Sequence, residues 1–142
     1  MILVVDDEKL DTEFMRRVLE GAAFDVLTAE DYATGVETFR TRKDEIGMAL
    51  LDVSLATRNG VELAKELLTL KPDLKVLFVS GHVGAEVIRF YGLAASDRHF
   101  LRKPFREAEL LARVREILKS DDPLQWLSPK ADANNSKAAN GN

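Results

Sequence analysis

The chain has 142 residues, of which 46% are apolar and 31% are charged, and its formal net charge at pH 7 is −4. This length and this balance suit a globular domain with a single hydrophobic core. The acidic surplus argues against a general nucleic-acid binder, because neutralising phosphates requires a basic surface. The absence of cysteine excludes disulfides, thiol catalysis and thiolate metal sites.

Nothing in the sequence predicts a membrane span or a signal peptide. The longest apolar runs have about five residues, far fewer than the ~20 that a spanning helix needs. The start of the chain lacks a basic segment and reaches Asp6 too early for a secretory signal. The expected compartment is therefore the cytoplasm, and Met1 is expected to be a true N-terminus.

Strand and helix patterns alternate along the chain. Strands are predicted from apolar runs of strand length, and helices from apolar positions at helical spacing. In chain order the predicted elements are strand 2–6, helix 8–20, strand 24–28, helix 32–42, strand 48–52, helix 61–70, strand 74–80, helix 84–92, strand 99–102 and helix 106–119. Gly21 and Lys71-Pro72 are suitable stops for the first and third helices.

This alternation predicts an α/β fold in which helices cover both faces of a parallel sheet. Right-handed crossovers then favour a doubly wound, five-stranded sheet with five helices, a flavodoxin-like three-layer sandwich. The apolar stripe of helix 8–20 includes Leu10 and Phe14, and that of helix 84–92 turns Val87, Ile88 and Tyr91 inward.

The domain is predicted to occupy residues 1–120, followed by a C-terminal extension at 121–142. From about residue 128 the composition changes to Ala, Asn, Ser, Lys and Gly without Leu, Ile, Val or Phe. Such a segment predicts a disordered tail or a truncated linker. Trp126, just before it, is expected to pack on the domain itself rather than on a partner.

Polar residues end or follow four of the predicted strands. Asp6 ends the first strand and Asp7 follows it, Asp52 ends the third, Ser80 ends the fourth, and Lys103 follows the fifth. In a parallel sheet such ends meet at one edge, where open α/β sheets place their sites. Three carboxylates, a hydroxyl and an ammonium at one edge predict a site for a hard cation and a phosphoryl group.

The carboxylates suit Mg²⁺, which prefers hard oxygen ligands. Asp7 and Asp52 are predicted to bind the ion directly, Asp6 through water, and the backbone carbonyl of Ser54 is predicted to complete the protein ligands. Taken alone, the acidic pair would be explained by an N-cap and an acidic first turn of helix 8–20. Clustered carboxylates repel one another, however, and are costly without a cation.

The remaining residues suit phosphoryl chemistry. Asp52 is the candidate nucleophile, because a carboxylate can accept a phosphoryl group as an aspartyl phosphate. Ser80 offers a hydroxyl and Lys103 a cation to the phosphoryl oxygens, while Gly81 leaves room for the group. Pro104 fixes the turn that aims Lys103, and a cis bond between the two residues would suit that turn. Each residue alone also has an ordinary structural explanation, as a cap, a turn or a solvated charge.

The ordered set Asp6-Asp7, Asp52, Ser80 and Lys103-Pro104-Phe105 resembles the receiver domain of two-component response regulators over roughly residues 1–120. The resemblance implies that Asp52 accepts a phosphoryl group from the phosphohistidine of a histidine kinase, or from a histidine phosphotransfer protein, with Mg²⁺ required. It implies a signalling switch rather than an enzyme. From the acidic balance and the short apolar runs, no direct binding of nucleic acid or membrane is expected.

By the same resemblance, Ser80 and Phe100 form the switch pair. The hydroxyl moves toward the phosphate and the aromatic ring turns inward, which reshapes the face made by helix 84–92, strand 99–102 and helix 106–119. Homodimerisation through that face is a further implication. Ser54 and His82, each two residues beyond a site residue, flank the route of attacking water in the family and are expected to tune the lifetime of the aspartyl phosphate.

Several alternatives remain beside this interpretation. One is a phosphate-independent receiver that acts only as an interaction module. Another is a receiver excised from a hybrid histidine kinase. Residues 94–100 resemble the corresponding segment of receivers attached to hybrid kinases more than that of transcriptional regulators. A flavodoxin-like electron carrier is disfavoured because Asp6-Asp7-Glu8 would repel a flavin phosphate. A haloacid-dehalogenase-type phosphatase needs a second Asp two residues after the nucleophile, where this chain has Ser54.

Overall fold

A computed structural model describes residues 1–90, 92 and 98–120, except for the side chains of residues 82, 83 and 85. The elements run β1 (Ile2–Val5), α1 (Lys9–Gly21), β2 (Val26–Ala29), α2 (Tyr32–Arg42), β3 (Met48–Asp52), α3 (Gly60–Leu70), β4 (Lys75–Ser80), α4 (His82–Phe90), β5 (Phe100–Arg102) and α5 (Glu107–Lys119). Tyr91, Trp126 and the C-terminal extension, for which the sequence made predictions, lie outside the described residues.

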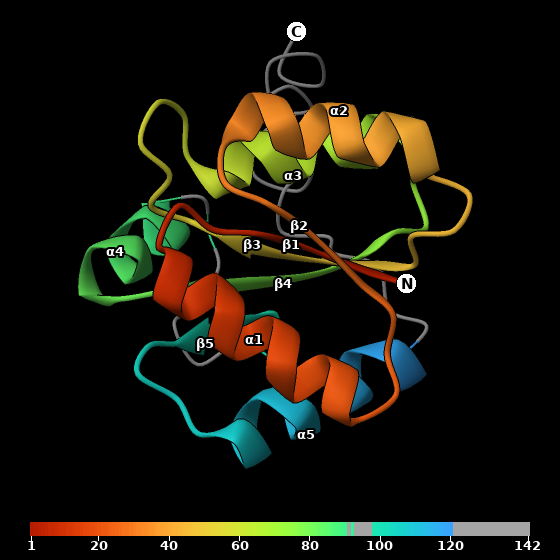
Figure 1. Cartoon of the computed structure of the whole chain (residues 1–142). Helices are drawn as coiled ribbons and strands as arrows, with labels where there is room; N and C mark the ends of the chain where they lie inside the picture. Colours follow the sequence, from red (N-terminus) through yellow and green to blue (C-terminus); the bar gives the residue numbers. More distant parts are fainter. Residues whose placement is uncertain (91, 93–97, 121–142) are drawn as a thin grey trace, which may run out of the picture.

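All five strands lie parallel in one sheet with the order β2-β1-β3-β4-β5. Helices α1 and α5 cover one face, and α2 and α3 cover the other (Figure 1). The predicted doubly wound α/β fold is therefore confirmed. None of the described helices has both the length and the apolar character that a membrane span requires.

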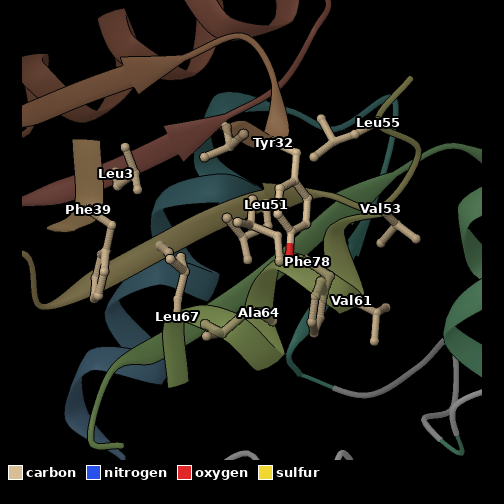
Figure 2. Packing of buried hydrophobic residues seen from close by; sticks show 14 of the residues in the cluster. Leu3, Tyr32, Phe39, Leu51, Val53, Leu55, Val61, Ala64, Leu67 and Phe78 are labelled. Atoms are coloured by element: carbon tan, nitrogen blue, oxygen red, sulfur yellow. The ribbon is translucent and has the colours of Figure 1, made fainter. Parts of the chain in front are cut away.

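The core has two layers because the strands bury side chains on both faces. Leu3, Ala49 and Phe78 point toward α2 and α3, while their neighbours Val4, Leu50 and Leu77 point toward α1 and α5. Figure 2 shows the first layer, where Tyr32 and Phe39 of α2 and Leu67 of α3 lie over the sheet. This double burial explains why the strand sequences are almost continuously apolar instead of alternating.

Three sequence predictions about element ends and core positions are wrong in detail. Leu10 is 86% exposed although it belongs to the apolar positions of the first helix. Helix α4 begins at His82, two residues before the predicted start.

Strand β2 begins at Val26 and not at the predicted residue 24, because the chain is still turning there. Ala23 has φ of 70°, and the Phe24 N–H donates to the Leu19 carbonyl over 3.0 Å. Helix α1 does end at Gly21, as predicted, and the residue with left-handed backbone is Ala23, two positions further on.

The β3–α3 loop is fixed against the end of β3 by a glycine. The Gly60 N–H donates to the Val53 carbonyl over 2.9 Å, and the Asn59 side chain caps α3 by accepting from the Glu62 N–H over 2.9 Å. A Cβ at position 60 would overlap the carbonyl oxygen of Asp52 and lie 2.9 Å from its carbonyl carbon. Only glycine therefore allows α3 to start directly against the backbone of Asp52.

We expect Gly60→Ala to lower the free energy of unfolding by about 1–3 kcal/mol, because backbone atoms must move to admit the methyl group. Gly47→Ala is the matched control, since nothing lies within 4 Å of a Cβ at that position. Urea denaturation of both variants measures the difference. Equal effects of the two substitutions would contradict the close approach at Gly60.

Candidate functional site

The polar residues predicted to form a site are brought together by the strand register. Asp6 follows β1, Asp52 ends β3 and Ser80 ends β4, so all three lie at the carboxyl edge of the sheet. The backbone N–H of Lys103 donates to the Ser80 carbonyl over 2.8 Å, which brings the turn after β5 to the same edge. The Lys103-Pro104 peptide bond in this turn is cis.

Three carboxylates form the centre of the site. Asp6, Asp7 and Asp52 can each place one oxygen within 4.8 Å of the others. Asp6 and Asp52 are buried, with 1% and 4% of their surface exposed, whereas Asp7 faces solvent. The two buried carboxylates each accept a backbone hydrogen bond over 2.9 Å, Asp6 from Glu8 and Asp52 from Ser54.

Lys103 supplies the positive charge at the centre of these carboxylates. Its Nζ lies 2.8 Å from Oδ2 of Asp6, 2.9 Å from Oδ2 of Asp11 and 3.3 Å from Oδ2 of Asp52. Asp11 was not predicted from the sequence. Its one signal was its place in the first turn of α1, four residues after Asp7, which brings it to the same end of the helix. One ammonium faces several carboxylates, so a net negative charge remains.

Burial and the neighbouring charges shift the pKa values of two of these groups. Burial raises the pKa of Asp6 to about 6, helped by the charge of Asp52 and opposed by the hydrogen bonds from Lys103 and the Glu8 N–H. Burial alone would lower the pKa of the Lys103 ammonium, but Asp6, Asp11 and Asp52 raise it overall. Lys103 is therefore permanently charged, and ionising Asp6 costs free energy until a further cation approaches.

The carboxylates fit a hard divalent cation. Their oxygens are the ligand type that Mg²⁺ prefers, and the net negative charge and the raised pKa of Asp6 both favour such an ion. Asp7 is exposed to solvent, and a hollow of about 520 Å³ reaches Asp6 from the side of α1 and β2. A second hollow of about 490 Å³ adjoins Lys103 and lies between Asp11, Phe14 and Phe105.

The raised pKa of Asp6 predicts a pH-dependent stability. A carboxyl whose pKa is about 6 when folded and near 4 when unfolded stabilises the fold below pH 4 and loses that contribution as the pH rises to about 6. Without Mg²⁺, we expect wild type to lose on the order of 2 kcal/mol over this range relative to Asp6→Asn. Urea unfolding of both proteins across pH 4–7 measures the difference. Parallel pH profiles would contradict a raised pKa at Asp6.

Two hydroxyl groups lie beside the carboxylates. The Ser80 side chain is buried, and its Oγ is 3.0 Å from Oγ of Ser54 in the β3–α3 loop. The Ser54 backbone N–H also donates to the Asp52 carboxylate, so Ser54 connects Asp52 to Ser80. The side chain of His82 lies outside the described residues.

The predicted switch aromatic is already packed inside the fold. Phe100 is 2% exposed and contributes to the core layer that includes Phe78 and Ile88. Arg113 of α5 donates to the Phe100 carbonyl over 2.7 Å and to the Arg98 carbonyl over 3.2 Å, which fixes the start of β5. In this conformation the Phe100 ring therefore points into the core.

A family model for the response regulator receiver domain matches residues 2–115. Among curated proteins, the chain is 33% identical over 118 residues to the transcriptional regulatory protein CpxR of Klebsiella pneumoniae, covering 83% of this chain and 49% of that protein. It is 31% identical over 122 residues to the response regulator MprA of a Mycobacterium species, covering 86% and 52%. The chain thus spans about half the length of the curated relatives it matches.

Solved structures agree with these similarities. The receiver domain of NtrX from Brucella abortus matches with a TM-score of 0.71 and 27% identity, over 84% of this chain and 99% of that one. A response regulator from Chloroflexus aurantiacus matches with a TM-score of 0.70 and 28% identity, over 84% and 97%. The match to the family model, residues 2–115, includes the whole sheet and the edge that carries the acidic site.

Proposed function

Because the chain belongs to the response regulator receiver domain family, we propose that it is a phosphorylation switch whose acceptor is Asp52. The observation that carries this proposal is the position of Asp52: it is buried at the sheet edge, 3.3 Å from Lys103 and within reach of two further carboxylates. A buried carboxylate beside a fixed cation is suited to attack a phosphoryl group whose charge the site neutralises.

In the proposed reaction, a carboxylate oxygen of Asp52 forms a bond to phosphorus while the bond between phosphorus and the imidazole nitrogen of a phosphohistidine breaks. The imidazole leaves with the electron pair of that bond. Lys103 neutralises charge on the phosphoryl oxygens, and hydrogen bonds to them come from the Ser54 N–H and, once its side chain has moved, from the Ser80 hydroxyl. Such a transfer depends mainly on alignment and charge neutralisation.

Asp7 and Asp52 are proposed as direct ligands of Mg²⁺, Asp6 as a ligand through water and Ser54 as a ligand through its carbonyl oxygen. When bound, the ion would supply positive charge against the phosphoryl oxygens. The donor set of Asp6, Asp7 and Asp52 and their mutual distances support this assignment.

We further propose that phosphorylation changes the positions of Ser80 and Phe100 and, through them, the face made by α4, β5 and α5. Phosphorylation adds nearly two negative charges at Asp52, which attracts a hydroxyl donor. Homodimerisation through this face remains part of the proposal. Ser54 and His82 are proposed to tune the lifetime of the aspartyl phosphate.

The proposed phosphoryl donor is a histidine kinase or a histidine phosphotransfer protein, and the proposed compartment is the cytoplasm. Receiver domains of this family are generally signalling modules rather than enzymes, and we assign this chain the same role. No direct contact with nucleic acid or membrane is proposed for the domain. A phosphate-independent interaction module is the rival function, and an origin in a hybrid kinase stays compatible with the fold.

The test is intact-mass analysis after incubation with Mg²⁺ and a small phosphodonor such as acetyl phosphate. The proposal predicts one added phosphoryl group per chain, and none after Mg²⁺ is removed with EDTA. A chain that gains no mass under any condition and forms no beryllofluoride complex would support the rival function instead.

A further inference from the structure

The side chain of Ser80 is held from two directions. Its hydroxyl makes a hydrogen bond with the Ser54 hydroxyl over 3.0 Å. The α-carbon of Gly84, one turn further along the chain in α4, closes the other side: a Cβ at position 84 would overlap both Oγ and Cβ of Ser80 and lie 3.3 Å from Cβ of Val53. Ser80 is 1% exposed, so this contact is shielded from water.

The position of Gly84 explains why the contact is so close. In a helix each Cα–Cβ bond tilts toward the N-terminus, so a side chain at position 84 would point at the turn that holds residue 80. Glycine has no Cβ, which allows the first turn of α4 to rest directly on Ser80. Within a helix, glycine is disfavoured relative to alanine, by about 1 kcal/mol at an interior position, so propensity does not account for this residue.

We propose that Ser54 and Gly84 are positioning residues for Ser80: Ser54 holds the hydroxyl while Asp52 is unmodified, and Gly84 makes the first turn of α4 move when Ser80 moves. The contacts run without a break from Oδ1 of Asp52 through the Ser54 N–H and hydroxyl to Ser80 and then to α4. The part that concerns phosphate rests on the proposed function, whereas the contact between Gly84 and Ser80 does not.

The contact is tested first without any phosphate, by a double-mutant cycle. Gly84→Ala is expected to lower Tm by several degrees in wild type, because Ser80 and the first turn of α4 must separate. In a Ser80→Gly background the same substitution is expected to leave Tm unchanged or to raise it, because the overlapping atoms are gone and alanine favours the helix. An equal loss in both backgrounds, or no loss in wild type, would overturn the role of Gly84.

Gly21→Ala is the matched control for helix propensity. It also lies in a helix, at the end of α1, and nothing lies within 4 Å of a Cβ there. It is expected to have the same small effect on Tm in both backgrounds.

The role of Ser54 is tested by binding of beryllofluoride with Mg²⁺, followed by ¹⁹F NMR. Ser54→Ala removes the resting partner of Ser80, so the apparent affinity is expected to rise by about 2- to 10-fold, the value of one net hydrogen bond. In a Ser80→Ala background the same substitution is expected to have no effect. Unchanged or weaker binding in Ser54→Ala, or an equal gain without Ser80, would overturn the proposal for Ser54.

The two experiments fail in different ways. A wild-type chain that binds no beryllofluoride refutes the proposed function, and with it the role of Ser54 in the phosphate response. The Tm cycle would still decide whether α4 rests on Ser80 through Gly84. If Gly84→Ala does not fold in the wild-type background but folds with Ser80→Gly, that rescue supports the contact directly.

Discussion

Asp52→Asn is expected to take up no phosphoryl group from a small donor in the presence of Mg²⁺. The amide keeps the shape of the side chain and can still accept the Ser54 N–H bond, but it is a far weaker nucleophile than a carboxylate. It also removes one of the two buried negative charges beside Lys103. Intact-mass analysis over time measures the loss against wild type.

Asp73→Asn is the matched control for this substitution. Asp73 is exposed and precedes β4, at the opposite end of the strand from Ser80, so its uptake of phosphate should equal that of wild type. Full incorporation into Asp52→Asn would contradict the assignment of Asp52 as the acceptor.

Lys103→Met is expected to slow phosphoryl transfer to Asp52 by roughly 10²-fold, the usual cost of losing one preorganised charge partner in a reaction of this kind. The same substitution is expected to raise the affinity for Mg²⁺ by about tenfold or more. The removed ammonium lies 2.8 and 3.3 Å from two of the carboxylates that would hold the ion, and it repels any cation that approaches them.

Slower phosphoryl transfer together with tighter Mg²⁺ binding would indicate an electrostatic role of Lys103. Simple damage to the fold would instead weaken both transfer and Mg²⁺ binding. Isothermal titration calorimetry measures Mg²⁺ affinity, and intact mass over time measures transfer. Lys43→Met is the control, because it removes the same charge from an exposed position at the end of α2. If Mg²⁺ affinity falls together with the transfer rate in Lys103→Met, the assigned role of Lys103 is wrong.

The fold could be predicted because its strands are buried on both faces. Continuous apolar runs such as Ile2–Val5 and Met48–Leu51 leave little choice except parallel strands between layers of helices. The element ends were less predictable, since they depend on local backbone geometry. The chain leaves α1 through Ala23 in a left-handed conformation, which no propensity for alanine would indicate.

The acidic site could be anticipated from position alone, because residues that end parallel strands meet at one edge. What the sequence did not reveal were the partners that reach the site from elsewhere. Asp11 pairs with Lys103 across 92 positions of sequence, and Gly84 leaves the space that the Ser80 side chain occupies. Such roles depend on packing between elements, and a single sequence does not encode them in a readable pattern.

Packing between elements also decides which apolar residues of α1 are buried, as Leu10 shows. Its spacing with Phe14 suits a buried stripe, yet Leu10 is 86% exposed while Met15 is fully buried. The stripe that α1 buries is set by its angle on the sheet, which follows from the neighbouring strands and α5. Apolar spacing therefore predicted the helix correctly but not which of its apolar residues enter the core.

In the proposed function, Asp52 and not another carboxylate of the cluster carries the phosphoryl group. Borohydride reduction of the acyl phosphate converts the modified aspartate to homoserine, and peptide mass spectrometry then locates that residue. Homoserine at position 52, absent without Mg²⁺ or phosphodonor, is the predicted result. Homoserine at position 6, 7 or 11 would assign the acceptor to a different carboxylate, and an unmodified chain would mean that the acidic edge accepts no phosphate.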